Sequence, residues 1–78
     1  MRDISEKAQI GSNVVIGKFV IIEDDVVIGD NSLIGDFTVI RKGTIIGENC
    51  KIKSYNEIRS NVIIGDNSSF GSRCTHSV

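Results

Sequence analysis

The sequence predicts an all-β protein made of about four stacked triangular coils, each of 18 residues and three six-residue units. The first observation is an isoleucine at every sixth position from Ile4 to Ile64, a series that Phe70 and His76 continue. Six residues turn an α-helix by about 600°, so this series would not stay on one helical face. An ordinary long strand instead alternates with a period of two. A chain that turns a corner every six residues returns each isoleucine to one interior, as in a parallel β-helix.

The second observation is a longer repeat, because one phrase recurs every 18 residues. It reads IGSNVVIG (10–17), IGDNSLIG (28–35), IGENCKIK (46–53) and IGDNSSFG (64–71). The third observation concerns the residue three places after each isoleucine, whose type depends on its position within this step. Each corner of the triangle therefore has its own chemistry, and the corner residues form three columns: Asn13, Asn31, Asn49 and Asn67; Phe19, Phe37, Tyr55 and Arg73; Lys7, Asp25, Gly43 and Asn61.

The interior is expected to hold one large and one small side chain from each six-residue unit. Alternate residues of a strand face the same way, so the residue two places before each isoleucine also points inward. This position is mostly small, as at Ala8, Val14 and Ser68. Asn56 is a larger, polar exception. Its burial requires hydrogen-bond partners, because an unpaired buried polar group costs about 1–3 kcal/mol.

The corners are expected to be tight turns. Asn and Gly tolerate a positive φ, which such turns need. Glycine also follows the isoleucine in seven of the units, where we expect the backbone to bend closely: Gly11, Gly17, Gly29, Gly35, Gly47, Gly65 and Gly71.

The outward strand positions, one before each isoleucine, are also rich in aliphatic residues. A monomer rarely exposes so much apolar surface, so we expect a homotrimer to bury it. The alternative is that these residues serve only the β propensity of the strands. The aromatic column has three interpretations: contact with a partner subunit, stacking along the prism, or a ligand platform. The outward aliphatic residues are Val15, Ile21, Val27, Leu33, Val39, Ile45 and Ile63.

Composition limits the class of protein. The 78 residues allow a single domain, 1–78, and the net charge of −1 gives no argument for nucleic-acid binding. Charge is nevertheless uneven, since residues 23–36 are acidic and residues 41–59 are mostly basic. The 18-residue step stacks Glu23, Arg41 and Arg59 in one column. This column is interpreted either as a salt-bridged solvent face or as a phosphate-binding edge.

The ends and the cysteines give further expectations. The charged N-terminus is not a signal peptide, and no apolar run is long enough to span a membrane, so we expect a cytoplasmic protein. Residues 1–9 are expected to form a modest cap. Cys50 and Cys74 lie in small inward positions on different sides, which disfavours a disulfide. The last coil stops before it is complete, which suggests a fragment of a longer protein or an edge covered by a partner.

The repeated motifs IGSNVV, IGKFVI, IGDNSL, IGDFTV, IGENCK and IGDNSS carry a family resemblance. The chain resembles the hexapeptide-repeat acyltransferases over its whole length, and this resemblance implies a left-handed parallel β-helix. The phrase IGKFVIIEDDVVIGDNSLIGDF is similar to the sugar-nucleotide N-acetyltransferases of this superfamily. The resemblance implies acetyl-coenzyme A, or another acyl-CoA, as co-substrate and a small-molecule sugar as acceptor. It also implies a trimer that binds the co-substrate between neighbouring prisms.

His76 is the candidate catalytic residue. It is the single histidine of the chain, and it occupies a position where the repeat calls for an aliphatic residue. A histidine suits a general base that accepts a proton during acyl transfer. It also lies near the end of an incomplete coil, where it need have no role. A β-helical carbonic anhydrase needs about three histidine zinc ligands, so no metal is expected. The alternative function is a non-catalytic β-helix module for trimerisation or scaffolding.

Overall fold

Short parallel strands make up the fold of the computed structural model, which describes residues 2–71 and 75–76. No helix occurs in these ranges, and hence none that could cross a membrane. Each strand contains the outward residue and the isoleucine of one six-residue unit, and the corner follows directly. The strands are β1 (Arg2–Ile4), β2 (Gln9–Ile10), β3 (Val15–Ile16), β4 (Val20–Ile22), β5 (Val27–Ile28), β6 (Leu33–Ile34), β7 (Val39–Ile40), β8 (Ile45–Ile46), β9 (Lys51–Ile52), β10 (Glu57–Ile58), β11 (Ile63–Ile64), β12 (Ser69–Phe70) and β13 (Thr75–His76).

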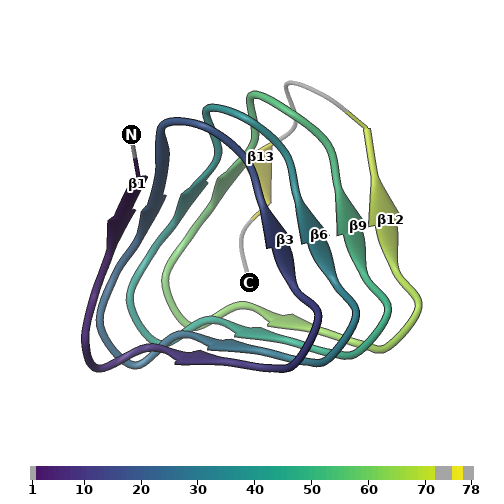
Figure 1. The fold of residues 1–78 in the computed structure, drawn as a ribbon, viewed down its shortest axis with the longest axis horizontal. Helices are drawn as coiled ribbons and strands as arrows, with labels where there is room; N and C mark the ends of the chain where they lie inside the picture. The colour runs from purple at the N-terminus through teal and green to yellow at the C-terminus, as the bar shows by residue number, and fades with distance from the viewer. Residues whose placement is uncertain (1, 72–74, 77–78) are drawn as a thin grey trace.

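Three parallel sheets form the sides of a triangular prism (Figure 1). Side A contains β1, β4, β7, β10 and β13, side B contains β2, β5, β8 and β11, and side C contains β3, β6, β9 and β12. Every strand pairs with the strand 18 residues away, as where Ile22 lies opposite Ile40 and Ile28 opposite Ile46. The predicted all-β fold of about four 18-residue coils is therefore confirmed.

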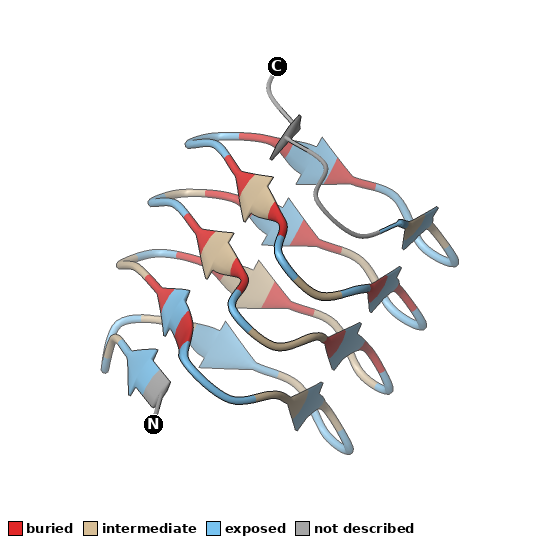
Figure 2. Cartoon of the chain, turned by 90° about the horizontal axis from the view of Figure 1, so that it is seen from above, coloured by how far each residue is buried: buried red, intermediate tan, exposed pale blue. Residues whose placement is uncertain are grey.

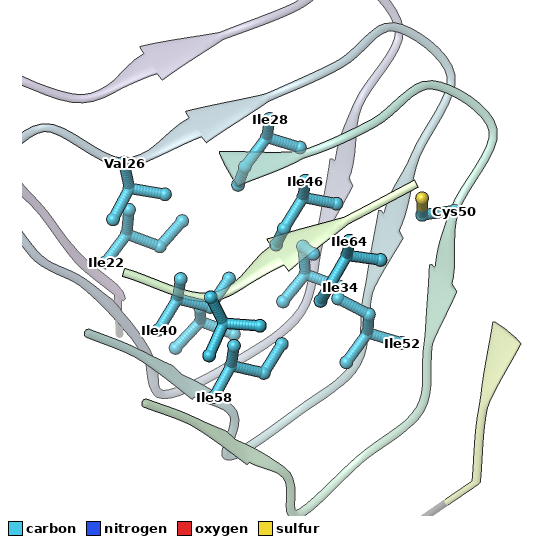
Figure 3. Packing of buried hydrophobic residues seen from close by; sticks show 12 residues of the cluster. Ile22, Val26, Ile28, Ile34, Ile40, Ile46, Cys50, Ile52, Ile58 and Ile64 are labelled. Atoms are coloured by element: carbon cyan, nitrogen blue, oxygen red, sulfur yellow. The ribbon is translucent and has the colours of Figure 1, made fainter. Parts of the chain in front are cut away.

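The isoleucines meet inside the prism (Figure 3). From Ile22 to Ile58 every isoleucine of the series is at most 1% exposed. The first coil differs, because no isoleucine coil lies on its outer side, and Ile4 and Ile10 are 37% and 36% exposed. Figure 2 shows this coil without any buried residue. The expectation of a cap at residues 1–9 was wrong, since β1 pairs with β4 as an ordinary strand of side A.

The corners owe their shape to the residue three places after each isoleucine. This residue has a positive φ at every described corner from Asn13 to Asn67, with values between 57° and 78°. The expected left-handed turns are confirmed, but they include Phe19, Phe37 and Tyr55, residue types that rarely adopt this conformation. Stacking of the coils imposes it, because the same turn must recur at each level.

The glycines that follow the isoleucines have a different role from the one expected. Their φ angles are not positive; instead, the next coil passes too close for a side chain. A Cβ on Gly29 would lie 2.6 Å from the carbonyl carbon of Gly47, and one on Gly35 would lie 2.6 Å from that of Lys53. Glycine is therefore required by the contact between coils and not by the bend.

Polar side chains in the small inward positions tie each coil to the next. The hydroxyl of Thr44 donates a hydrogen bond to the carbonyl oxygen of Arg59, 15 residues ahead, at 2.6 Å. The hydroxyls of Ser32 and Thr38 donate to carbonyl oxygens at the same offset. These bonds satisfy hydroxyls that are at most 1% exposed, which is why polar residues are tolerated in the interior.

Asn56 and Cys50 follow the same principle. Asn56 is 2% exposed, and its side-chain amide donates to the carbonyl oxygen of Lys53 at 2.6 Å, so the expected partner exists. Cys50 is a buried free thiol whose Sγ lies 3.2 Å from the carbonyl oxygen of Gly65. Cys74 lies outside the described residues.

Candidate functional site

His76 continues side A at the C-terminal end of the prism. Strand β13 pairs in parallel with β10, and His76 lies opposite Ile58. Ile58 is fully buried, so the backbone register places His76 in the column of inward isoleucines. Its side chain lies outside the described part of the structure, and its catalytic role stays a prediction.

Two hollows lie on the outer surface of side A near its N-terminal end. The larger is lined by Asp3, Ser5, Ile21, Ile22, Glu23, Asp24 and Lys42. The smaller is more apolar and is lined by Asp3, Phe19, Val20 and Ile21. They share the outward residues of β1 and β4, so they form two parts of one surface groove.

The structure does not bring His76 to this groove. The strand order of side A is β1, β4, β7, β10 and β13, so the groove and His76 lie at opposite ends of the sheet. Three strand spacings separate β4 from β13, which is roughly 14 Å at about 4.8 Å per strand. The larger hollow also has three carboxylates and one ammonium group in its lining. A negative surface of this kind suits a phosphate-bearing ligand poorly.

Basic residues instead gather nearer to His76. Lys51 is the outward residue of β9 on side C, and Lys53 follows that strand; both are exposed. Neither side chain forms an ion pair within the described residues. These two ammonium groups are therefore available to an anionic ligand at the C-terminal half of the prism.

The predicted charged column on side A is partly a salt-bridge network. One nitrogen of Arg41 lies 3.1 Å from a carboxylate oxygen of Glu23, and another lies 3.3 Å from Glu57. The hydrogen bonds to Glu23, and then to Glu57, raise the pKa of the exposed Arg41 side chain. Arg59, the third member, makes no ion pair with any residue that the structure describes. The salt-bridged interpretation is confirmed for Glu23 and Arg41.

The aromatic column stacks along the prism. The ring centroids of Phe19 and Phe37 are 5.1 Å apart with planes 11° from parallel, and those of Phe37 and Tyr55 are 5.1 Å apart and 7° from parallel. The separation follows the spacing between coils. Stacking occupies both faces of the Phe37 ring, which leaves mainly ring edges for a ligand or a partner. Contact of this column with a second subunit stays a prediction.

No metal centre is evident in the described ranges, since they contain no cluster of three His, Cys, Asp or Glu side chains that could bind an ion. Sequence reasoning missed the groove on side A. The groove arises from β1 lying beside β4, and the only signal in the sequence is the outward Asp3 next to a column of aliphatic residues.

Comparison with known proteins identifies the repeat. The family model described as bacterial transferase hexapeptide (six repeats) matches residues 7–42 and 43–75, which is most of the chain. No curated protein matches the chain significantly.

Two solved structures of acetyltransferases from Caulobacter crescentus have a similar fold. One is a histidine-to-alanine mutant of GDP-perosamine N-acetyltransferase in complex with CoA and GDP-perosamine, with a TM-score of 0.67 and 18% identity. The other is a histidine-to-asparagine mutant of perosamine N-acetyltransferase with the same two ligands, with a TM-score of 0.58 and 18% identity. Both alignments cover 100% of this chain and 51% of the other, so the chain spans about half the length of these enzymes.

Proposed function

Because the chain belongs to the bacterial transferase hexapeptide family, we propose that it is an acyltransferase or the N-terminal part of one. The reaction moves an acetyl or other acyl group from coenzyme A to an amino or hydroxyl group of a sugar or sugar nucleotide. The family match over nearly the whole chain is the observation that carries this proposal. The two similar structures hold CoA and GDP-perosamine, which supports the same classes of donor and acceptor.

The charges of the described residues fit an anionic co-substrate at the C-terminal half of the prism. Lys51 and Lys53 are exposed cations without ion pairs to described residues, and they would hold the phosphates of coenzyme A or of a nucleotide sugar. Acetyl-CoA supplies an activated thioester. Both lysines lie in the coil next to β13, so they belong to the same end of the molecule as His76.

In the proposed mechanism His76 is the general base. It accepts a proton from the acceptor amine or hydroxyl as that group attacks the thioester carbonyl, and the coenzyme A thiolate then leaves. A histidine is suited to this step because its ordinary pKa lies near neutral pH. The proposal further includes a homotrimer and a cytoplasmic location.

A calorimetric titration with acetyl-CoA tests the proposal. We expect saturable binding that weakens at least tenfold in a Lys51→Gln/Lys53→Gln double variant, since two phosphate contacts are lost. His76→Asn should retain binding and abolish acetyl transfer, because it removes the base but not the cations. The proposal fails if acetyl-CoA binds neither to this chain nor to a longer natural chain that contains it.

The second candidate is a non-catalytic module for trimerisation or scaffolding. The observation that favours it is the register of His76, which falls in the inward column and at the far end of side A from the groove. Stable assembly without acetyl-CoA binding in the same titration would support this function over the enzyme.

A further inference from the structure

Side B carries the least polar outer surface of the prism. Its four outward residues are Gln9, Val27, Ile45 and Ile63, and none is charged. Side A has Asp3 and Glu57 in the equivalent positions, and side C has Lys51. Ile45 is 43% exposed and Ile63 is 76% exposed, so the apolar row is most open in the C-terminal half of the side.

The two edges of this apolar row have opposite charges. Lys42, at the corner between sides A and B, precedes Ile45 by three residues, and Glu48, at the corner between sides B and C, follows it by three. One coil further on, Arg59 and Asp66 flank Ile63 in the same order. Lys42, Glu48, Arg59 and Asp66 are all exposed. None of them forms an ion pair within the described residues.

We propose that side B is the surface on which copies of this chain pack in parallel around a common axis. A rotation axis parallel to the prism turns side B of every copy toward that axis. It brings the basic edge of one copy against the acidic edge of the next at equal height, because rotation preserves the level of each coil. Lys42 then faces Glu48 of the neighbouring copy, while the isoleucines of the row are buried together (side B is the bottom side in Figure 1).

An antiparallel packing of two side B surfaces has the opposite electrostatics at the acidic edge. It places the corner with Asp30, Glu48 and Asp66 against the same corner of the other copy, with no basic residue between them. The second coil adds no preference for the parallel arrangement, since Asp25 and Asp30 make both edges acidic there. The more exposed isoleucines lie in the third and fourth coils, where the edges are complementary, and these coils decide the orientation.

This inference deepens the proposed homotrimer by naming the contact surface and the relative direction of the chains. It depends on the proposed function only for the number of copies. Assembly and acetyl-CoA binding are separate measurements, so an assembled protein that does not bind acetyl-CoA refutes the enzyme and leaves the contact surface intact.

The first test is the molar mass by sedimentation equilibrium. Ile63→Lys should dissociate the wild-type oligomer, with an association constant at least tenfold weaker. The matched control is Val15→Lys, an outward aliphatic position on side C that is 58% exposed, and it should leave the oligomer intact. A wild-type monomer, or equal dissociation by both variants, overturns the proposal. Far-UV circular dichroism confirms that each variant keeps its strands.

The second test is a charge reversal across the contact. Lys42→Glu and Glu48→Lys should each weaken association about tenfold, and the Lys42→Glu/Glu48→Lys double variant should restore it. In the antiparallel arrangement Glu48→Lys instead strengthens association, because it places a cation among facing carboxylates. Strengthening, or no effect of either single reversal, overturns the parallel packing.

Discussion

Gly29 offers the sharpest test of how the coils stack. A Cβ at this position would lie 2.6 Å from the carbonyl carbon of Gly47 and 2.7 Å from the amide nitrogen of Glu48. Ordinary van der Waals contact with a Cβ begins near 3.4 Å, so Gly29→Ala requires the two coils to separate locally by roughly 0.8 Å. Both contacts are backbone atoms, which cannot rotate away as a flexible side chain would.

The separation has a calculable consequence. The amide of Gly29 donates to the carbonyl oxygen of Ile46 at 2.8 Å. Adding the displacement lengthens this distance to about 3.6 Å, which is no longer a hydrogen bond. Loss of one such bond costs about 0.5–1.5 kcal/mol, and overpacking costs a further 1–3 kcal/mol. We therefore expect Gly29→Ala to lower the free energy of unfolding by about 2–4 kcal/mol.

Urea unfolding followed by far-UV circular dichroism measures this change. Gly65→Ala is the matched control, because it follows an isoleucine on the same side and its Cβ would meet nothing within 4 Å. The control should be neutral or stabilise the fold by about 0.4–1 kcal/mol through the entropy of the unfolded chain. Equal stability of the two variants would refute the role of the glycines as close-approach residues.

Three further stability predictions can be checked with the same urea assay. Thr44→Val should cost about 1 kcal/mol by removing the hydroxyl bond to Arg59, while Thr44→Ser should cost less because it keeps that hydroxyl; the reverse order would contradict the bond. Phe37→Gly should be more stable than Phe37→Ala by about 1 kcal/mol, since φ is 58° there; an advantage for alanine would argue against the left-handed corner. Ile40→Ala should cost about 2–5 kcal/mol and Ile4→Ala clearly less, because Ile40 is 0% exposed and Ile4 is 37% exposed; similar costs would contradict the open first coil.

The regular part of the fold could be predicted from the sequence because every six-residue unit repeats one packing problem. A wrong register would expose the isoleucines, so the 18-residue step, the three sides and the buried series from Ile22 to Ile58 all follow from one pattern. The hydrogen-bond partner required by Asn56 follows from the cost of burying an unpaired amide.

Features that depend on contact between coils could not be predicted. Local propensity does not favour a positive φ at Phe37, yet the coils above and below impose it and the ring stacks in compensation. The close approach at Gly29 is likewise visible only once neighbouring coils are placed. The groove on side A combines Asp3 of the first coil with Lys42 of the third, residues far apart in the sequence.

The candidate site illustrates the same limit. His76 was identified because it interrupts the aliphatic series, and the register with Ile58 now places its backbone in the inward column. Sequence spacing alone did not reveal that the groove lies at the opposite end of side A. The exposed Lys51 and Lys53 supply the positive charge nearer to His76, and they arise on side C.

Release of free coenzyme A thiol from acetyl-CoA, measured in the presence of a nucleotide-linked amino sugar, tests the proposed activity most directly. The proposal predicts thiol release that requires the amino sugar and is lost in His76→Asn, which removes the general base. No amino-sugar-dependent release, either by this chain or by a longer natural chain that contains it, would contradict the acyltransferase.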